Sequence, residues 1–139
     1  MRKAILILSA IYLTAIGFAL ILVPLRFGTG AVPPDASPQL LALLRLLGGP
    51  LLGIAALNWL MRDAGPSPGL RAVLIANVVG FGAVALNDVH GVFSGEAREL
   101  AKVFLVVHLG FALAFLGLVL RLRKKGRHGR EPRDVDRAR

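Results

Sequence analysis

The chain has 139 residues, of which 55% are hydrophobic and 18% are charged, and its 17 Lys+Arg against 8 Asp+Glu give a formal net charge of +9. A soluble domain of this length carries charge on about a quarter of its residues, so the composition excludes a soluble nucleic-acid binder despite the basic balance. It also excludes a disordered chain, because such chains are poor in apolar residues. Since the chain has no cysteine, disulfides, thiolate metal sites, iron–sulfur clusters and thiol catalysis are excluded.

Hydropathy predicts four membrane-spanning helices, at about residues 4–25, 38–61, 70–89 and 99–120. A bilayer core of roughly 30 Å requires about 20 apolar residues in a helix, and each segment is long enough. The first apolar run is longer than the 7–15 residues or so of a signal-peptide core, so we expect a retained helix. The sequence therefore predicts an all-α polytopic membrane protein, with residues 1–123 forming four transmembrane helices in an antiparallel bundle.

The basic residues are distributed unevenly between the two ends of these spans. Ten lie on one side of the predicted membrane: Arg2, Lys3, Arg62, Arg71, Arg121, Arg123, Lys124, Lys125, Arg127 and Arg130. The other side has only Arg26, Arg98 and Lys102. By the positive-inside rule, both termini are expected in the cytoplasm, in a multi-pass protein of a bacterial inner (plasma) membrane. Residues 124–139 are expected to form a basic, disordered cytoplasmic tail.

One arginine does not fit this topological explanation. Arg45 lies about seven residues into the second span, where a charge costs on the order of 3 kcal/mol. Two interpretations are open. Arg45 pairs with Asp88 and joins the second and third spans, or it binds an anionic or carbonyl-bearing ligand in an outward-facing cavity.

Further polar groups fall within the third and fourth spans. His108 lies on an otherwise apolar face, where it serves as a proton relay, a haem or metal ligand, or a hydrogen-bond partner of a neighbouring helix. His90 is expected in a loop, too shallow to share a haem with His108. Asn77 and Asn87 belong to a polar stripe that ends at Asp88, whereas Asn58 of the second span is expected to be solvated near the cytoplasmic boundary.

The predicted ligand-binding residues are therefore Arg45, Asp88, His108, Asn77 and Asn87. No metal and no cofactor is expected to be bound. The predicted ligand is a lipid or another hydrophobic small molecule.

The second span also contains the residues expected to govern helix packing. Gly49 and Gly53 form a small-xxx-small pair that lets a neighbouring backbone approach. Gly48 is a further predicted packing position. Pro50, which follows Gly49, removes one backbone hydrogen bond and predicts a kink. Gly80 contributes a small position to the third span.

From Arg45 to Gly53, and in the hydropathy profile of residues 1–123, the chain resembles small bacterial four-helix membrane proteins of largely unknown function, among them the DoxX-like group. In that group an arginine is followed by a helix rich in glycine and leucine, although usually in the first span rather than the second. The resemblance implies a four-helix membrane fold and no particular activity.

Motifs of the common enzyme classes are missing from the chain. No glycine-rich phosphate loop, His-Glu-x-x-His sequence or Ser-His-Asp set is visible. We therefore expect a non-catalytic, accessory role in which the protein binds a lipid-like ligand or a partner membrane protein, without nucleic acid. A small transporter or channel, as a homodimer or larger oligomer, is the alternative, and a membrane redox or lipid-modifying enzyme is the third.

Overall fold

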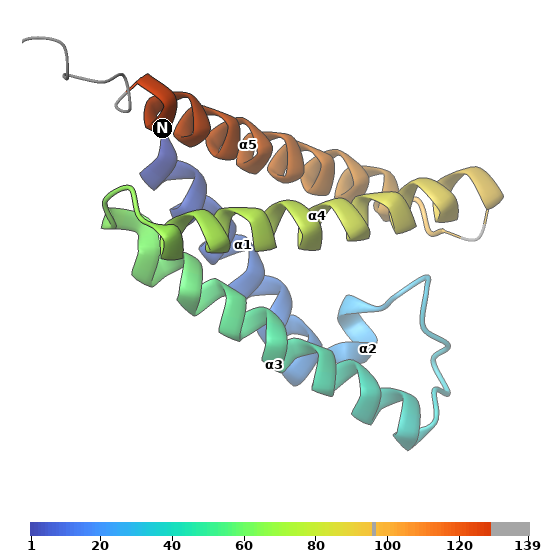
Figure 1. Cartoon of the computed structure of the whole chain (residues 1–139). Coiled ribbons are helices and arrows are strands. Elements are labelled where there is room, and N and C mark those ends of the chain that lie inside the picture. Colours follow the sequence, from blue (N-terminus) through green and yellow to red (C-terminus); the bar gives the residue numbers. More distant parts are fainter. Residues whose placement is uncertain (96, 129–139) are drawn as a thin grey trace, which may run out of the picture.

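The computed structural model describes residues 1–95 and 97–128, and this part of the chain is helical, with 84% helix and no strand. The elements are α1 (Arg2–Leu22), α2 (Pro24–Phe27), α3 (Pro38–Leu60), the 3-10 turn η1 (Met61–Asp63), α4 (Pro68–Ser94) and α5 (Leu100–His128) (Figure 1). Four segments are long and apolar enough to cross a membrane, namely Arg2–Leu22, Pro38–Asp63, Pro68–Ser94 and Leu100–Arg123. The predicted all-α class and the four candidate spans of a multi-pass membrane protein are confirmed.

Local sequence signals explain where two of the long helices begin. Ser37 and Ser67 are the N-caps of α3 and α4, and their hydroxyls accept hydrogen bonds from the backbone N–H of Leu40 (3.2 Å) and Leu70 (3.1 Å). A proline follows each cap at the first helical position, where its missing N–H costs nothing. Serine followed by proline thus fixes both starts.

The helix ends differ from the predicted ones. The first helix ends at Leu22 rather than Leu25, because Val23 leaves the helical conformation (φ −136°, ψ 51°) and Pro24 begins the separate short helix α2. Helix α4 continues beyond the predicted end at Val89 to Ser94, and Gly95, with φ 76°, provides the left-handed turn that ends it. His90 therefore lies in a helix, not in a loop.

The fourth long helix also extends further than predicted. Helix α5 continues through residues 124–128, which had been assigned to the basic tail. Lysine and arginine are good helix formers, so a basic composition does not by itself end a helix. The rest of the predicted tail, residues 129–139, lies outside the described residues.

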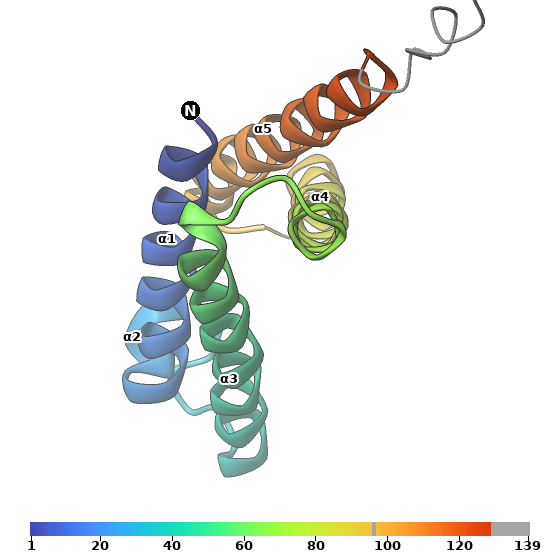
Figure 2. The ribbon, with the colours of Figure 1, turned by 60° about the vertical axis from the view of Figure 1, so that its left-hand side comes forward.

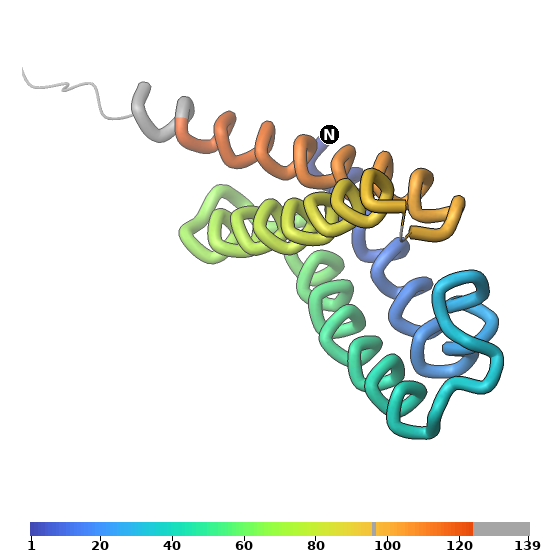
Figure 3. The backbone as a smooth tube through the Cα atoms, turned by 90° about the vertical axis from the view of Figure 1, so that its right-hand side faces the viewer, coloured from blue at the N-terminus to red at the C-terminus, as the bar shows by residue number. Residues whose placement is uncertain are grey.

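The four long helices form two pairs whose members run in opposite directions. Helix α1 packs along α3, and α4 packs along α5. Figures 1 and 2 show the two pairs diverging from the end of the molecule where α1 begins. The tube in Figure 3 shows the same opening between the pairs.

A glycine-to-glycine contact sets the distance between α1 and α3. A Cβ added to Gly48 would lie 2.6 Å from the carbonyl oxygen of Gly17, and one added to Gly17 would lie 3.1 Å from that of Gly48. The other predicted packing glycines behave differently. Gly49, Gly53 and Gly80 have no atom within 4 Å of an added Cβ, so the prediction that Gly49 and Gly53 seat a neighbouring helix of this chain is wrong. The close contact is made by Gly48, one residue before Gly49. Helix α3 continues through Pro50, which is exposed.

Apolar side chains are distributed as expected for a protein surrounded by lipid. The core where the pairs converge contains Leu6, Leu13, Leu70, Leu74, Phe81 and Phe115. Many other large apolar side chains face outward, such as Leu60 and Leu86, each 72% exposed. Outward-facing leucines on four spans are stable in hydrocarbon and costly in water.

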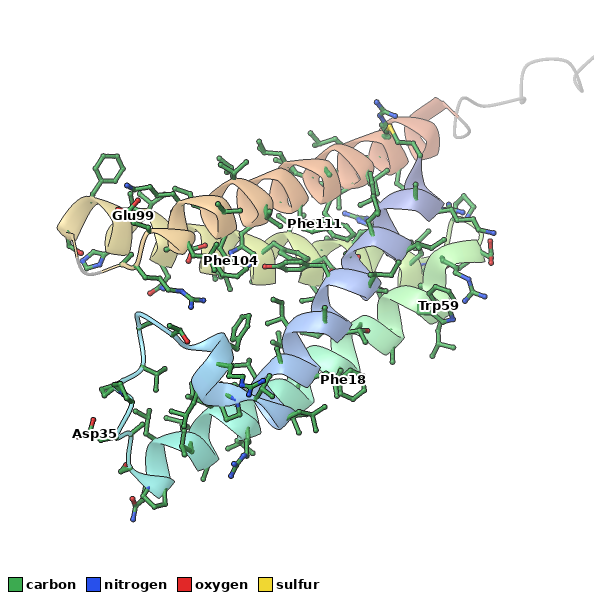
Figure 4. All side chains as sticks on the ribbon, turned by 180° about the vertical axis from the view of Figure 1, so that it is seen from behind. Phe18, Asp35, Trp59, Glu99, Phe104 and Phe111 are labelled. Atoms are coloured by element: carbon green, nitrogen blue, oxygen red, sulfur yellow. The ribbon has the colours of Figure 1, made fainter. Side chains whose placement is uncertain are left out.

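The basic residues Lys3 and Arg121 lie at the end where the pairs converge. Lys3 at the start of α1 forms an ion pair of 2.7 Å with Asp63 of η1. Arg121 near the end of α5 reaches the sulfur of Met1 at 3.6 Å. In Figure 4, Asp35 and Glu99 mark the opposite, open end, far from Trp59. The start of α1 and the basic end of α5 therefore share one end of the molecule.

Candidate binding site between the helix pairs

A partly open cavity of about 550 Å³ lies between the two helix pairs. Helices α1, α2, α3, α4 and α5 all contribute to it, and much of its wall is apolar, including Leu13, Ile16, Leu51 and Ile54. Its polar lining residues are Tyr12, Asn77, Asn87, Asp88, Arg98 and His108. Its volume falls within the roughly 300–1,000 Å³ of typical small-molecule sites.

The main polar feature of the cavity is a hydrogen-bonded chain from three helices. His108 of α5 places Nδ1 2.6 Å from Oδ2 of Asp88 on α4, and its Nε2 2.7 Å from the hydroxyl oxygen of Tyr12 on α1. The side chains of His108 and Asp88 are 13% and 14% exposed. An ionised carboxylate only accepts hydrogen bonds, so Nδ1 of His108 carries the hydrogen of the first contact. These hydrogen bonds between Asp88, His108 and Tyr12 link the α4–α5 pair to the α1–α3 pair.

Aromatic rings hold the imidazole in this orientation. The ring of Phe104 stacks on His108 with centroids 6.0 Å apart and planes 14° apart, and Phe81 lies 6.1 Å away on α4. Phe111 packs against both Tyr12 (5.6 Å) and Phe81 (4.8 Å). Figure 4 shows Phe104 and Phe111 on the side of α5 that faces α1. The polar chain is thus enclosed by rings that limit its contact with water.

Beside the cavity, an amide pair joins three helices. Asn58 of α3 and Asn77 of α4 exchange two hydrogen bonds of 2.9 and 2.7 Å. Asn58 also donates to the hydroxyl of Ser9 on α1 at 3.0 Å, and Asn77 donates to the carbonyl of Val73 at 2.9 Å. The expectation that Asn58 is solvated is wrong, because its side chain is fully buried. Asn77 lines the cavity, but these bonds already use both its amide oxygen and its amide nitrogen.

Arg98 connects the two pairs at their open end. From the segment between α4 and α5, its Nη1 donates to the carbonyl oxygens of Phe27 (2.7 Å) and Thr29 (2.8 Å) at the end of α2 and just beyond it. Its guanidinium carbon lies 5.6 Å from the ring centroid of Phe27 and 5.7 Å from that of Phe104. Sequence reasoning treated Arg98 only as a topological charge. Nothing in the sequence places α2 beside it.

The structure brings together four of the five predicted ligand-binding residues. Asp88, His108, Asn77 and Asn87 line the cavity, as does Gly80. Arg45 does not, because its side chain is exposed on another face of α3. The proposed Arg45–Asp88 pair is a wrong interpretation, since Asp88 is bonded to His108 and, in the described part of the chain, Arg45 forms no ion pair.

Tyr12 is the member of the polar chain that the sequence did not single out as a site residue. It is a polar residue within the apolar first span, and a single tyrosine in an apolar helix gives no sign of its partner. Only its position opposite His108 in the folded chain reveals the link.

The donor set favours hydrogen bonding over metal coordination. Within the described ranges, no group of three or more His, Cys, Asp or Glu side chains is placed to hold a metal ion. The cavity instead combines an apolar wall with a few convergent polar groups, the arrangement that fixes the polar end of an amphiphilic molecule.

Comparison with known proteins adds no family to this description. No family model matches the chain, and neither the curated proteins nor the solved structures contain a match.

Proposed function

We propose that this protein binds a lipid-like amphiphile in the cavity between its helix pairs, in a non-catalytic role. The observation that carries the proposal is the combination of an apolar cavity of about 550 Å³ with the Asp88–His108–Tyr12 chain on its wall. The apolar wall accommodates a hydrocarbon chain, and the hydrogen-bonded Asp88, His108 and Tyr12 side chains bind the head group. Both groups of contacts come from helices that the sequence marks as membrane spans.

We further propose that the two pairs form one antiparallel bundle in a bacterial inner membrane, with both termini in the cytoplasm. The basic residues at the start of α1 and along the end of α5 lie at one end of the molecule, which supports this orientation under the positive-inside rule. Membership of the DoxX-like group remains a prediction from the sequence pattern.

A matched pair of glycine substitutions tests the binding site. Gly80 lines the cavity and Gly53 does not, yet a Cβ at either position meets no atom within 4 Å. Gly80→Leu is expected to fill the cavity and lower the affinity for 1-hexadecanol at least tenfold, whereas Gly53→Leu leaves it unchanged. The measurement is native mass spectrometry of the purified protein titrated with the alcohol. Equal affinities for the two variants would refute the site.

A proton-coupled transporter is the second candidate. The observation in its favour is the same titratable chain, because Asp, His and Tyr side chains in hydrogen-bond contact form a path for protons. Proton flux into protein-containing liposomes, driven by a gradient of a hydrophobic solute, would distinguish transport from binding alone.

A further inference from the structure

We infer that the cavity takes up a proton at His108 together with a single-chain anionic amphiphile, such as a long-chain carboxylate. This inference rests on the proposed binding function and names its ligand class. It depends on the hydrogen-bond polarity of the Asp88–His108–Tyr12 chain and on the charges around the cavity.

The protonation of one imidazole nitrogen decides what Tyr12 offers to a ligand. While His108 is neutral, Nε2 has a lone pair, so the Tyr12 hydroxyl donates to it and its oxygen only accepts from a ligand. Once His108 is protonated, Nε2 donates to the Tyr12 oxygen, and the hydroxyl hydrogen is free to bond a ligand oxygen. Proton uptake therefore changes the Tyr12 hydroxyl from an acceptor to a donor of a hydrogen bond to the ligand.

Arg98 supplies further donors at the mouth of the cavity. In the described structure its two backbone hydrogen bonds both use Nη1, which leaves Nη2 and Nε for a ligand. Phe104 lies between the two polar groups, because its ring contacts both the guanidinium of Arg98 and the ring of His108. An anionic head group such as a carboxylate provides acceptor oxygens for these donors.

The balance of charge also favours an anion with a proton. Among the described residues, the charged groups that line the cavity are Asp88 and Arg98, which sum to zero while His108 is neutral. A bound anion alone would leave one uncompensated negative charge in a largely apolar environment, which is costly. Protonation of His108 restores neutrality.

Few titratable groups surround His108 in the part of the chain that the structure describes. Tyr12 faces it from α1, Asp88 from α4, and Arg98 lines the same cavity from the α4–α5 segment. On α5 itself, Glu99 and Lys102 pair with each other in exposed positions. Helix α3 contributes no titratable side chain to the described lining. We assign the proton to His108, because its Nε2 faces the Tyr12 hydroxyl that would then donate to the ligand.

The test uses a probe whose own charge does not titrate. The full-length protein in phosphatidylcholine nanodiscs is titrated with hexadecane-1-sulfonate and with the neutral 1-hexadecanol between pH 5.5 and 8.5, by calorimetry in two buffers of different ionisation enthalpy. Because each bound anion is accompanied by one proton, sulfonate binding should be strongest at low pH. It should weaken by roughly tenfold per pH unit once free His108 is neutral, with close to one proton taken up. Hexadecanol binding should lack this decline.

Three variants assign the effect to the proposed groups. His108→Gln keeps a polar side chain that cannot be protonated, so sulfonate affinity should lose its pH dependence. Tyr12→Phe should weaken sulfonate binding at low pH and leave the pH dependence in place. Lys102→Gln, which removes an exposed base of the same helix, is the control and should behave as the unaltered protein.

The possible failures separate this inference from the proposed function. If hexadecanol binds but sulfonate binds without proton uptake or pH dependence, the coupled anion site is wrong and the lipid-like site stands. If neither probe binds, the proposed function itself is wrong. Displacement of the sulfonate by phosphatidylglycerol added to the nanodiscs would overturn the assignment to a single-chain ligand.

Discussion

At the residue scale, the polar groups buried among the four spans are bonded to one another in two separate sets. One set is the Asp88–His108–Tyr12 chain, and the other joins Ser9, Asn58 and Asn77. A buried polar group without a partner costs about 1–3 kcal/mol, so each set depends on all its members. The second set lies beside the cavity and contains no ionisable group, which makes it the structural one.

Asn58→Ala should therefore destabilise the protein although it removes only a small side chain. It deprives Asn77 of two hydrogen bonds and Ser9 of one donor, and we expect a loss of about 1–3 kcal/mol in the free energy of unfolding. Unfolding in mixed micelles with increasing denaturing detergent measures this quantity. Ser94→Ala is the control, because this exposed hydroxyl donates to the carbonyl of Gly91 and, among the described residues, to no other group. An Asn58→Ala variant as stable as that control would contradict the structural role.

The sequence predicted part of this site because intramembrane polarity is visible in a linear chain. Asp88, His108 and Asn77 stand out as polar residues in apolar segments, and all three line the cavity. Their partners could not be predicted, because pairing depends on how the helices rotate and cross. Arg45 is the residue for which the sequence was misleading. Its place in an apolar segment suggested a buried partner, but its side chain is exposed on α3.

At the scale of the elements, small residues determine which helix faces meet. Gly17 and Gly48 let the backbones of α1 and α3 approach, whereas Gly49 and Gly53, one and five positions further along α3, face away from the rest of the chain. The hydropathy of the sequence predicted the four long helices, and the structure adds the serine–proline caps at the starts of α3 and α4. The register of the glycine contact could not be predicted, because several glycines in one helix offer several faces.

Gly48→Ala and Gly49→Ala should therefore have opposite effects. At Gly48 the new methyl group would lie 2.6 Å from both the carbonyl oxygen of Gly17 and the side chain of Ile21, so α1 and α3 must separate at a cost of about 1–3 kcal/mol. At Gly49 the methyl group meets no atom within 4 Å, and better helix propensity predicts a change between zero and about 1 kcal/mol in favour of folding. Thermal unfolding of both variants in the same detergent measures the two changes in stability. A destabilised Gly49→Ala would show that this face is occupied.

At the scale of the whole molecule, the two helix pairs converge at one end and diverge at the other, and Arg98 bridges the open end. Its two hydrogen bonds run from the α4–α5 segment to carbonyl oxygens beside α2. Hydrogen bonds from a charged donor contribute about 1.5–3 kcal/mol each. Arg98 therefore helps to hold the two pairs together at the mouth of the cavity.

Arg98→Ala is expected to let the pairs move apart. A loss of about 3 kcal/mol would raise the population of open molecules roughly a hundredfold relative to closed ones. Because the chain has no cysteine, spin labels can be attached at Asp35→Cys and Phe93→Cys, two exposed positions on opposite pairs. Their distance distribution, measured by double electron–electron resonance, should become longer and broader in the variant. Lys102→Ala should leave it unchanged, and an equally unchanged Arg98→Ala would show that the bridge does not hold the mouth.

The unequal lengths of the two pairs have a consequence for the membrane itself. Helices α1 and α3 have 21 and 23 residues, and α4 and α5 have 27 and 29. At 1.5 Å per residue the first pair is about 32–35 Å long and the second about 40–44 Å. In a hydrocarbon layer of about 30 Å, the longer pair must tilt more steeply or project from the surface. We expect a thicker bilayer to reduce that tilt and to bring the pairs closer to parallel, which would narrow the mouth of the cavity.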